Sequence, residues 1–302
     1  MSPPDPAAYD QAIANFPAGV HDKLQGFRDN NNFCGVVSDV AARDLAEQTG
    51  WGINQVMLGL LDFARLYART PISRFGVGAI AQGLSGALYY GANMEFVGEA
   101  LSFTVHAEQA ATANAWTHGE TGLRSLAISA APCGHCRQFL YELTTASALQ
   151  IFLPDRTPTM LTNLLPEAFE PRHLGVEGGL MRTENHQLVL QSDDPLVLAA
   201  VAAANMSYAP YSKGYAGVAL ATRDGQVYSG PYAENAAFNP SIAPMEAALA
   251  HLNMCGRTGQ DITQAVLVEV QGSQCSQVNV TRNVLGAISH VELRVERARM
   301  PV

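Results

Sequence analysis

The sequence lacks an apolar run long enough to cross a bilayer. A membrane-spanning helix needs about 18 or more apolar residues in a row. The best candidate, 195–206, is short and follows Asp193 and Asp194, which are typical of a helix start. The first residues also lack the basic and apolar regions of a signal peptide. We therefore expect no membrane partner.

Basic residues are scarce. The chain has 18 Lys and Arg against 27 Asp and Glu, which gives a net charge of -9 and a pI near 5.3. An acidic surface repels polyanions, whereas proteins that bind nucleic acid concentrate Lys and Arg. We therefore expect no nucleic acid among the partners.

Cysteine is rare, and its number is odd: there are five. A small secreted disulfide framework normally has an even and higher number. Cys133 and Cys136 stand together, whereas Cys34, Cys255 and Cys275 are far apart along the chain. We predict that these last three are free thiols in a reducing compartment, and that the protein is cytoplasmic.

Two short motifs carry the reactive side chains. Segment 106–108 reads H-A-E, and segment 132–136 reads P-C-G-H-C. His106 is expected to open a helix over 107–116, and Pro132 suits the first turn of a second helix. Both thiols then lie on one face of that helix. We predict that the two helix starts face one another.

These motifs supply one imidazole and two thiolates, a donor set that selects zinc. We predict one zinc ion per chain, bound by His106, Cys133 and Cys136. Tetrahedral zinc takes four ligands, so three protein ligands leave a position for water, as in catalytic sites. Glu108 is expected above that water as the catalytic proton carrier and not as a ligand.

Other interpretations of the motifs exist. A C-x-x-C alone also fits a redox pair or half of a structural zinc site. A thioredoxin-like protein would leave His106 and Glu108 without a purpose. His135 is a possible ligand, but we expect it to point away from the metal. Arg137 fits either compensation of the charge at the site or an exposed helix cation equally well.

The combination of H-x-E with P-C-x-x-C is the pattern of zinc deaminases. The chain resembles cytidine deaminase, of the long homodimeric bacterial type with a catalytic and a degenerate half. The resemblance includes segments 67–79 and 91–96. It implies that Phe75 stacks on the pyrimidine and that Asn93 and Glu95 hold the ribose hydroxyls.

The resemblance also implies that Ala107 and Phe169 contact the substrate. Segment 164–169 is similar to a family segment whose Phe reaches the active site of the neighbouring subunit. A homodimer with its active site near the interface follows from this likeness. From the residues alone, Phe75 also fits a core, Asn93 a turn cap, and Phe169 an anchor for a linker.

The expected fold class is α/β, a three-layer αβα cytidine deaminase-like fold with a mixed sheet, duplicated within the chain, plus a small helical N-terminal domain. The predicted units are a helical N-terminal domain, a catalytic domain, a linker rich in Pro and Gly, and a degenerate domain without zinc. Their expected ranges are 1–48, 49–154, 155–191 and 192–302.

The second half repeats the first at an offset of about 140 residues. Segment 235–238 is similar to 93–96, and 243–246 is similar to 105–108 without the metal ligands. In this alignment Glu246 keeps the acid of Glu108. We expect this half to bind no metal and to pack against the catalytic half.

The resemblance implies zinc-dependent hydrolytic deamination of cytidine and 2'-deoxycytidine in pyrimidine salvage. Three alternatives stay open. A deaminase of nucleotides or single-stranded nucleic acid would show more Lys and Arg. A deaminase of another base would leave Asn93 and Glu95 without a clear purpose. A non-catalytic zinc module would need no carboxylate such as Glu108.

Overall fold

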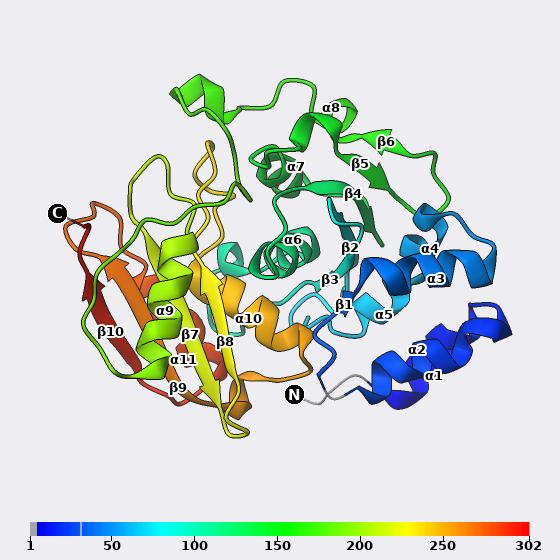
Figure 1. Cartoon of the computed structure of the whole chain (residues 1–302), viewed down its shortest axis with the longest axis horizontal. Coiled ribbons are helices and arrows are strands. Elements are labelled where there is room, and N and C mark those ends of the chain that lie inside the picture. Colours follow the sequence, from blue (N-terminus) through cyan, green and yellow to red (C-terminus); the bar gives the residue numbers. More distant parts are fainter. Residues whose placement is uncertain (1–4, 31, 302) are drawn as a thin grey trace.

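The computed structural model describes residues 5–30 and 32–301 and contains two β-sheets with helices on both faces (Figure 1). The first sheet has six strands in the order β1-β3-β2-β4-β5-β6. Strand β2 is antiparallel to β3 and β4, whereas β4 and β5 are parallel, so the sheet is mixed. The strands are β1 (Val36–Val37), β2 (Gly78–Gly83), β3 (Leu88–Ala92), β4 (Leu123–Ile128), β5 (Gln150–Phe152) and β6 (Thr159–Met160).

The second sheet has four strands in the order β10-β9-β7-β8 and repeats the central part of the first. Strand β7 is antiparallel to β8 and β9, and β9 is parallel to β10, so this sheet is also mixed. These findings confirm the duplicated α/β architecture. The strands are β7 (Ala216–Thr222), β8 (Val227–Pro231), β9 (Ile262–Val270) and β10 (Leu293–Ala298).

Two central helices lie between the sheets (Figure 1): α6 (Ala107–Thr117) packs on β3 and β2, and α10 (Pro244–Met254) packs on β8 and β7. The two helices also contact each other. On the outer side of the second sheet lies α9 (Pro195–Met206), whose N-cap is Asp194 as the sequence predicts. Two more helices flank the sheets: α7 (Gly134–Leu140) near α6 and α11 (Val278–Ile288) near α10.

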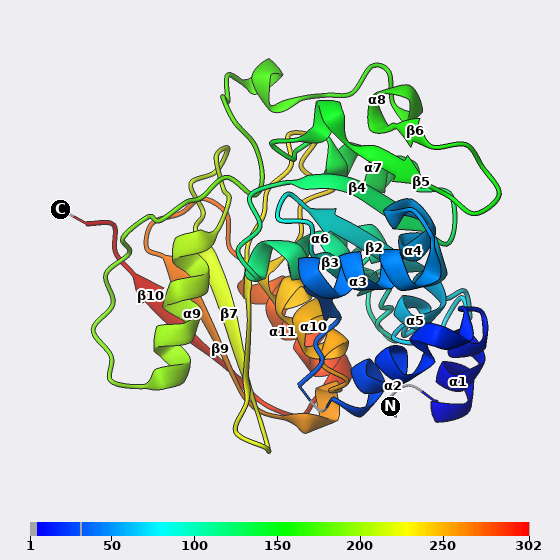
Figure 2. The same ribbon diagram turned by 45° about the vertical axis from the view of Figure 1, so that its right-hand side comes forward.

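The remaining helices lie mainly on the outer side of the first sheet. Helix α5 packs on β2 and β3, α4 packs on β4, and α3 lies beside α4 (Figure 2). Ser38 is the N-cap of α3, and its side chain accepts the Ala41 N–H. Helices α1 and α2 lie beside α5, and their Tyr9, Ile13 and Leu24 join one apolar cluster with the sheet residue Tyr90. The domain boundaries stay a prediction. The helices are α1 (Pro6–Ala14), α2 (His21–Asp29), α3 (Asp39–Thr49), α4 (Ile53–Gly59), α5 (Leu61–Arg65) and α8 (Leu161–Leu164).

The two halves share their apolar cores. Met94 and Val105 of the first half are buried in one cluster with residues of the second sheet such as Val218 and Leu267. In the opposite direction, Tyr208 of the second half joins the cluster under the first sheet. The surfaces between the halves are therefore packed as a protein interior.

The prediction of three free thiols outside the zinc motif is wrong for two of them. Cys34 and Cys255 are joined by a disulfide across a sequence separation of 221 residues, whereas Cys275 is free and exposed. Folding brings the segment before β1 against the C-terminal end of α10, a contact that sequence spacing does not reveal. Within the described residues, no helix combines the length and apolar character that a membrane crossing requires.

Gly91 and Gly230 set the distance between each sheet and its central helix. A Cβ atom at Gly91 would lie 2.2 Å from the backbone nitrogen of Ala111, and one at Gly230 would lie 2.1 Å from that of Ala248. Backbone atoms of a packed helix have little freedom to retreat, so only glycine fits these two positions.

We expect Gly91→Ala and Gly230→Ala each to lower the free energy of unfolding by about 3 kcal/mol, because the added methyl overpacks a strand–helix contact. The control is Gly26→Ala, which lies in α2 with no neighbouring atom within 4 Å of the added Cβ. Helix propensity predicts that this change stabilises by about 0.5–1 kcal/mol. Urea unfolding gives the free energy of unfolding of the three variants. Equal stability of Gly91→Ala and the wild type would contradict the packing argument.

Candidate active site

The structure brings His106, Cys133 and Cys136 together. Their potential ligand atoms all lie within 4.8 Å of one another, and Cys133 Sγ lies 3.7 Å from His106 Nδ1. His106 is the N-cap of α6 and Cys133 the N-cap of α7, so the two helix starts meet as the sequence predicts. The placement of Pro132 in the first turn is wrong, because α7 begins at Gly134 and the Cys133 sulfur accepts the Cys136 N–H at 3.5 Å.

The donor set fits zinc. Bonds of about 2.3 Å to sulfur and 2.0–2.1 Å to nitrogen place tetrahedral ligand atoms roughly 3.5–3.8 Å apart. Hydrogen bonds from Cys136 and His106 lower the pKa of the Cys133 thiol, which favours the metal-binding thiolate. The hydrogen bond to Cys133 raises the pKa of His106. Cys133 Sγ and His106 Nδ1 therefore lie at a separation that two ligands of one zinc ion would have.

Glu108 lies in the first turn of α6 and is 4 % exposed. Burial raises the pKa of its carboxyl, and the nearby Cys136 thiol and His106 imidazole partly offset this increase. Its oxygen atoms do not belong to the three-residue donor group. Glu108 thus borders the donor group with a carboxyl that favours the protonated form more than an exposed glutamate does.

His135 and Gln109 surround the His106 imidazole. The His135 ring stacks on that of His106 at 5.1 Å between centroids, although His135 lies outside the donor group. Gln109 Oε1 accepts the His106 backbone N–H at 3.1 Å, and its Nε2 lies 3.3 Å from His135 Nε2. Sequence analysis missed Gln109. Its position three residues after the N-cap is the signal of a capping box.

Arg137 is half-buried and so is not the exposed helix cation considered for it, whereas charge compensation at the site stays a prediction. The guanidinium is half-buried and donates to the backbone oxygens of Pro132 and Leu164, each at 2.9 Å. It thus fastens the turn before Cys133 to the end of α8. Arg137 positions a zinc-ligand loop through neutral carbonyls.

Asn93 and Glu95 hold the loop that carries Phe75. Asn93 Oδ1 accepts the Val77 N–H at 2.8 Å, and its Nδ2 donates to Phe75 O at 3.0 Å. Glu95 accepts the backbone N–H of Ser73 at 3.0 Å and also the Ser73 hydroxyl, a contact that sequence analysis missed. The Phe75 side chain is 62 % exposed, so it is not a core residue.

The second half corrects the predicted alignment around these residues. There, Glu234 accepts the Ser212 N–H at 3.1 Å and the Ser212 hydroxyl, just as Glu95 does with Ser73. Segment 232–234, and not 235–238, is therefore equivalent to 93–95. Tyr232 stands in the place of Asn93, so the amide is specific to the first half.

The interpretation of Glu246 as the counterpart of Glu108 is also wrong. Glu246 Oε2 accepts the backbone N–H of the N-cap Ala243 at 2.8 Å, which is the role of Gln109 in α6. Met245 consequently stands in the place of Glu108. The spacing between the halves is shorter in these helices than in the strands, and this shift is not visible in the sequence.

Ala107 lies at the start of α6, and Phe169 lies beside α7. The Phe169 backbone is bonded to the Gln138 side chain of α7, from Nε2 to the oxygen at 2.6 Å, while its ring stays 44 % exposed. Ala107 is the first residue of α6 and is buried. Phe169 is thus anchored through its backbone beside the helix that carries Cys136, with a free aromatic face.

The chain is similar to known proteins over most of its length. Profiles of the cytidine and deoxycytidylate deaminase zinc-binding region match residues 54–151 and 161–282. Cytidine deaminase of Aliivibrio fischeri is 44% identical over 280 residues, covering 93% of this chain and 94% of that protein. The chain belongs to the cytidine deaminase family. The Aeromonas salmonicida cytidine deaminase is 47% identical over 268 residues, which cover 88% of this chain and 91% of that protein.

A solved family member is much shorter. The crystal structure of cytidine deaminase from Mycobacterium tuberculosis is 36% identical in sequence. The alignment covers 38% of this chain and 95% of the Mycobacterium tuberculosis chain, with a TM-score of 0.36. Both halves of the present chain match a family model of the zinc-binding region. Among the described residues, only the first half contains a complete donor group of its own.

We expect His106→Ala to retain one zinc ion fewer per chain than wild type after dialysis, because binding weakens by more than about 100-fold when a ligand is lost. His135→Ala is the matched control, since it removes the stacked imidazole from outside the donor group. Metal analysis by mass spectrometry distinguishes the two. Equal zinc loss in both variants would make His135 a ligand as well.

Proposed function

We propose that the protein catalyses the zinc-dependent hydrolytic deamination of cytidine and 2'-deoxycytidine to uridine and 2'-deoxyuridine, with release of ammonia, in pyrimidine salvage. The observation that carries this proposal is the buried Glu108 carboxyl beside the His106, Cys133 and Cys136 group. Membership of the cytidine deaminase family and the names of the relatives support the same substrate class.

His106, Cys133 and Cys136 would hold the zinc ion. When bound, zinc acts as a Lewis acid and makes a hydroxide nucleophile available near neutral pH. Glu108 moves the protons. It takes a proton from water and gives it to ring N3, so that C4 becomes electrophilic. It later takes the remaining proton of the hydroxyl bonded to C4 and gives it to the amine, so that the C4–N bond breaks, C4=O forms and ammonia leaves. Burial favours this proton transfer, because it raises the pKa of the Glu108 carboxyl towards neutral pH.

The substrate is held by groups around the two helix starts. Phe75 offers an exposed aromatic face to the pyrimidine. Asn93 keeps a second Nδ2 hydrogen beyond its bond to Phe75 O, and Glu95 is a carboxylate acceptor, so the pair suits the sugar hydroxyls. The backbone N–H of Ala107 lies in the first turn of α6, where a helix has no internal acceptor, and it donates to the pyrimidine oxygen.

Glu108→Gln is expected to lower kcat for cytidine by about 100- to 10,000-fold while zinc content stays unchanged, because only the proton carrier is lost. Glu246→Gln is the matched control, since Glu246 is also buried at the start of a central helix. Its kcat should equal that of wild type. Ammonia release gives the rates, and undiminished activity of Glu108→Gln would refute the mechanism.

The substrate class is tested with cytidine, deoxycytidine, CMP and adenosine under the same conditions. The proposal requires the two cytosine nucleosides to react fastest, since the acidic chain offers little attraction for a phosphate. Fastest turnover of CMP would overturn the nucleoside assignment.

We also propose a cytoplasmic homodimer with Phe169 near the substrate at the subunit interface. A reducing compartment keeps Cys133 and Cys136 as thiols that can bind zinc. Sedimentation velocity is expected to give the mass of two chains, and cell fractionation is expected to place the activity in the cytoplasm.

Phe169→Ala should raise KM for cytidine by about 3- to 10-fold without loss of zinc, which corresponds to one aromatic contact. Leu174→Ala is the control, because Leu174 has nearly the same exposure, 43 % against 44 %, in the same part of the chain. Steady-state kinetics and metal analysis measure both variants. An unchanged KM would leave Phe169 as an anchor of the linker.

A further inference from the structure

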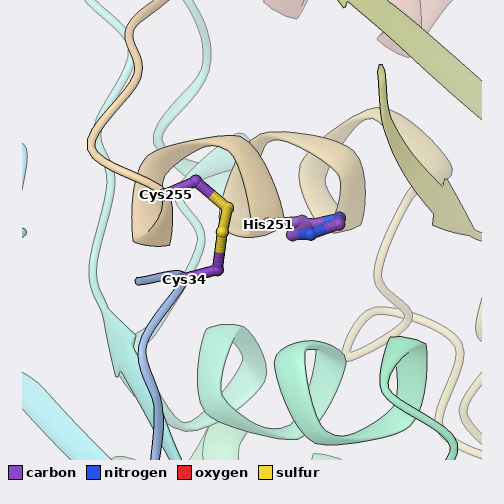
Figure 3. Close-up of side chains that lie close together, drawn as sticks. All are labelled: Cys34, His251 and Cys255. Atoms are coloured by element: carbon purple, nitrogen blue, oxygen red, sulfur yellow. A yellow bond between two sulfur atoms is a disulfide. The ribbon is translucent and has the colours of Figure 1, made fainter. Parts of the chain in front are cut away.

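A second cluster of metal-binding side chains consists of Cys34, His251 and Cys255 (Figure 3). Their potential ligand atoms also lie within 4.8 Å of one another. The cluster lies at the opposite end of α6 from the active site. The His251 ring is 5.5 Å from that of His118, the C-cap of α6, whereas His106 is the N-cap. Eleven helical residues separate the two ends, roughly 16 Å.

Two members of the cluster come from one helix. His251 lies in the last turn of α10, and Cys255 is the C-cap of that helix. Residues four apart lie on the same helix face, so the imidazole and the sulfur are neighbours by local geometry alone. The C-terminal end of a helix also favours a bound cation, because the backbone dipoles place partial negative charge there.

The third member, Cys34, is held in place by backbone contacts that do not depend on its sulfur. The buried Asn114 amide of α6 donates to the carbonyl oxygens of Cys34 at 3.2 Å, Gly35 at 3.3 Å and Tyr90 at 3.0 Å. Gly35 has φ 68°, and a Cβ there would lie 3.0 Å from Tyr90 Cβ. The Cys34 sulfur therefore stays beside α10 when the disulfide is reduced.

The His251 side chain has the properties of a metal ligand. Its Nδ1 atom is buried and has no hydrogen-bond partner among the residues that the structure describes. Burial, and then the nearby His118, lower the pKa of His251 to about 4, so the ring is neutral at physiological pH. Neutral imidazole is the form that binds metals. A buried ring nitrogen without a partner is costly, and one nitrogen of this ring lies within 4.8 Å of both sulfurs.

We propose that Cys34, His251 and Cys255 form a second zinc site when the two cysteines are reduced, and that this bound ion and the Cys34–Cys255 disulfide exclude each other. A dithiol reductant supplies two electrons and two protons, the S–S bond breaks, and the reductant becomes a disulfide. Zinc then displaces the two thiol protons. Both states connect the segment before β1 to the second half, so oxidation exchanges one cross-link for another.

The test is the zinc content of the full-length protein in two redox states. After reduction with a dithiol, incubation with ZnSO4 and gel filtration, the wild type is expected to hold two zinc ions per chain. After air oxidation, which restores the disulfide, it is expected to hold one. Reduced His251→Gln and Cys255→Ser should each hold one, because they lose a ligand of the second site only.

Two controls separate this proposal from a simple disulfide. Oxidised His251→Gln should still form the Cys34–Cys255 bond in peptide mapping, which shows that its fold is intact. Cys275→Ser should hold two zinc ions when reduced, because Cys275 is outside both clusters. One zinc ion per reduced wild-type chain, or two in reduced His251→Gln, would overturn the proposal. Neither result would bear on Glu108, so the test is independent of the deaminase mechanism.

Discussion

The close approach of α6 to β3 determines the rest of the structure. Because Gly91 has no side chain, the helix backbone lies directly on the strand, and both faces of α6 are buried between the two sheets. The N-terminal end of α6 then meets α7 and places His106 and Glu108 against the two thiols. The C-terminal end presents Asn114 and His118 to the segment before β1 and to α10. The placement of α6 thus positions the His106 cluster at one end of the helix and the His251 cluster at the other.

The local parts of the site could be predicted from the sequence. Cys133 and Cys136 are close because they lie within one turn, and His106 marks a helix start through its neighbours, so spacing alone indicates a donor set. The duplicated α/β architecture follows from strands and helices that alternate in both halves. These inferences depend on contacts between residues that are near in sequence.

The errors concern contacts between distant segments. Cys34 and Cys255 meet only because Asn114 and Gly35 bring a loop of the first half to α10, and no sequence spacing indicates this. The mismatch of Glu246 with Glu108 has a similar origin. A shift of one residue between the halves changes which side chain caps the helix, and only the bond to Ala243 reveals it. The bond from Arg137 to Leu164 O also joins two elements, so the sequence does not indicate it.

The shared cores of the two halves have a further consequence. Met94 and Val105 are buried among residues of the second sheet, and Tyr208 is buried beneath the first. If either sheet were removed, buried apolar residues of the other would become exposed to solvent. Each half therefore covers apolar residues of the other that would otherwise be exposed to water. Removal of the second half would require new polar surface residues in the first half at every such contact, which gives a physical reason for the two halves to stay in one chain.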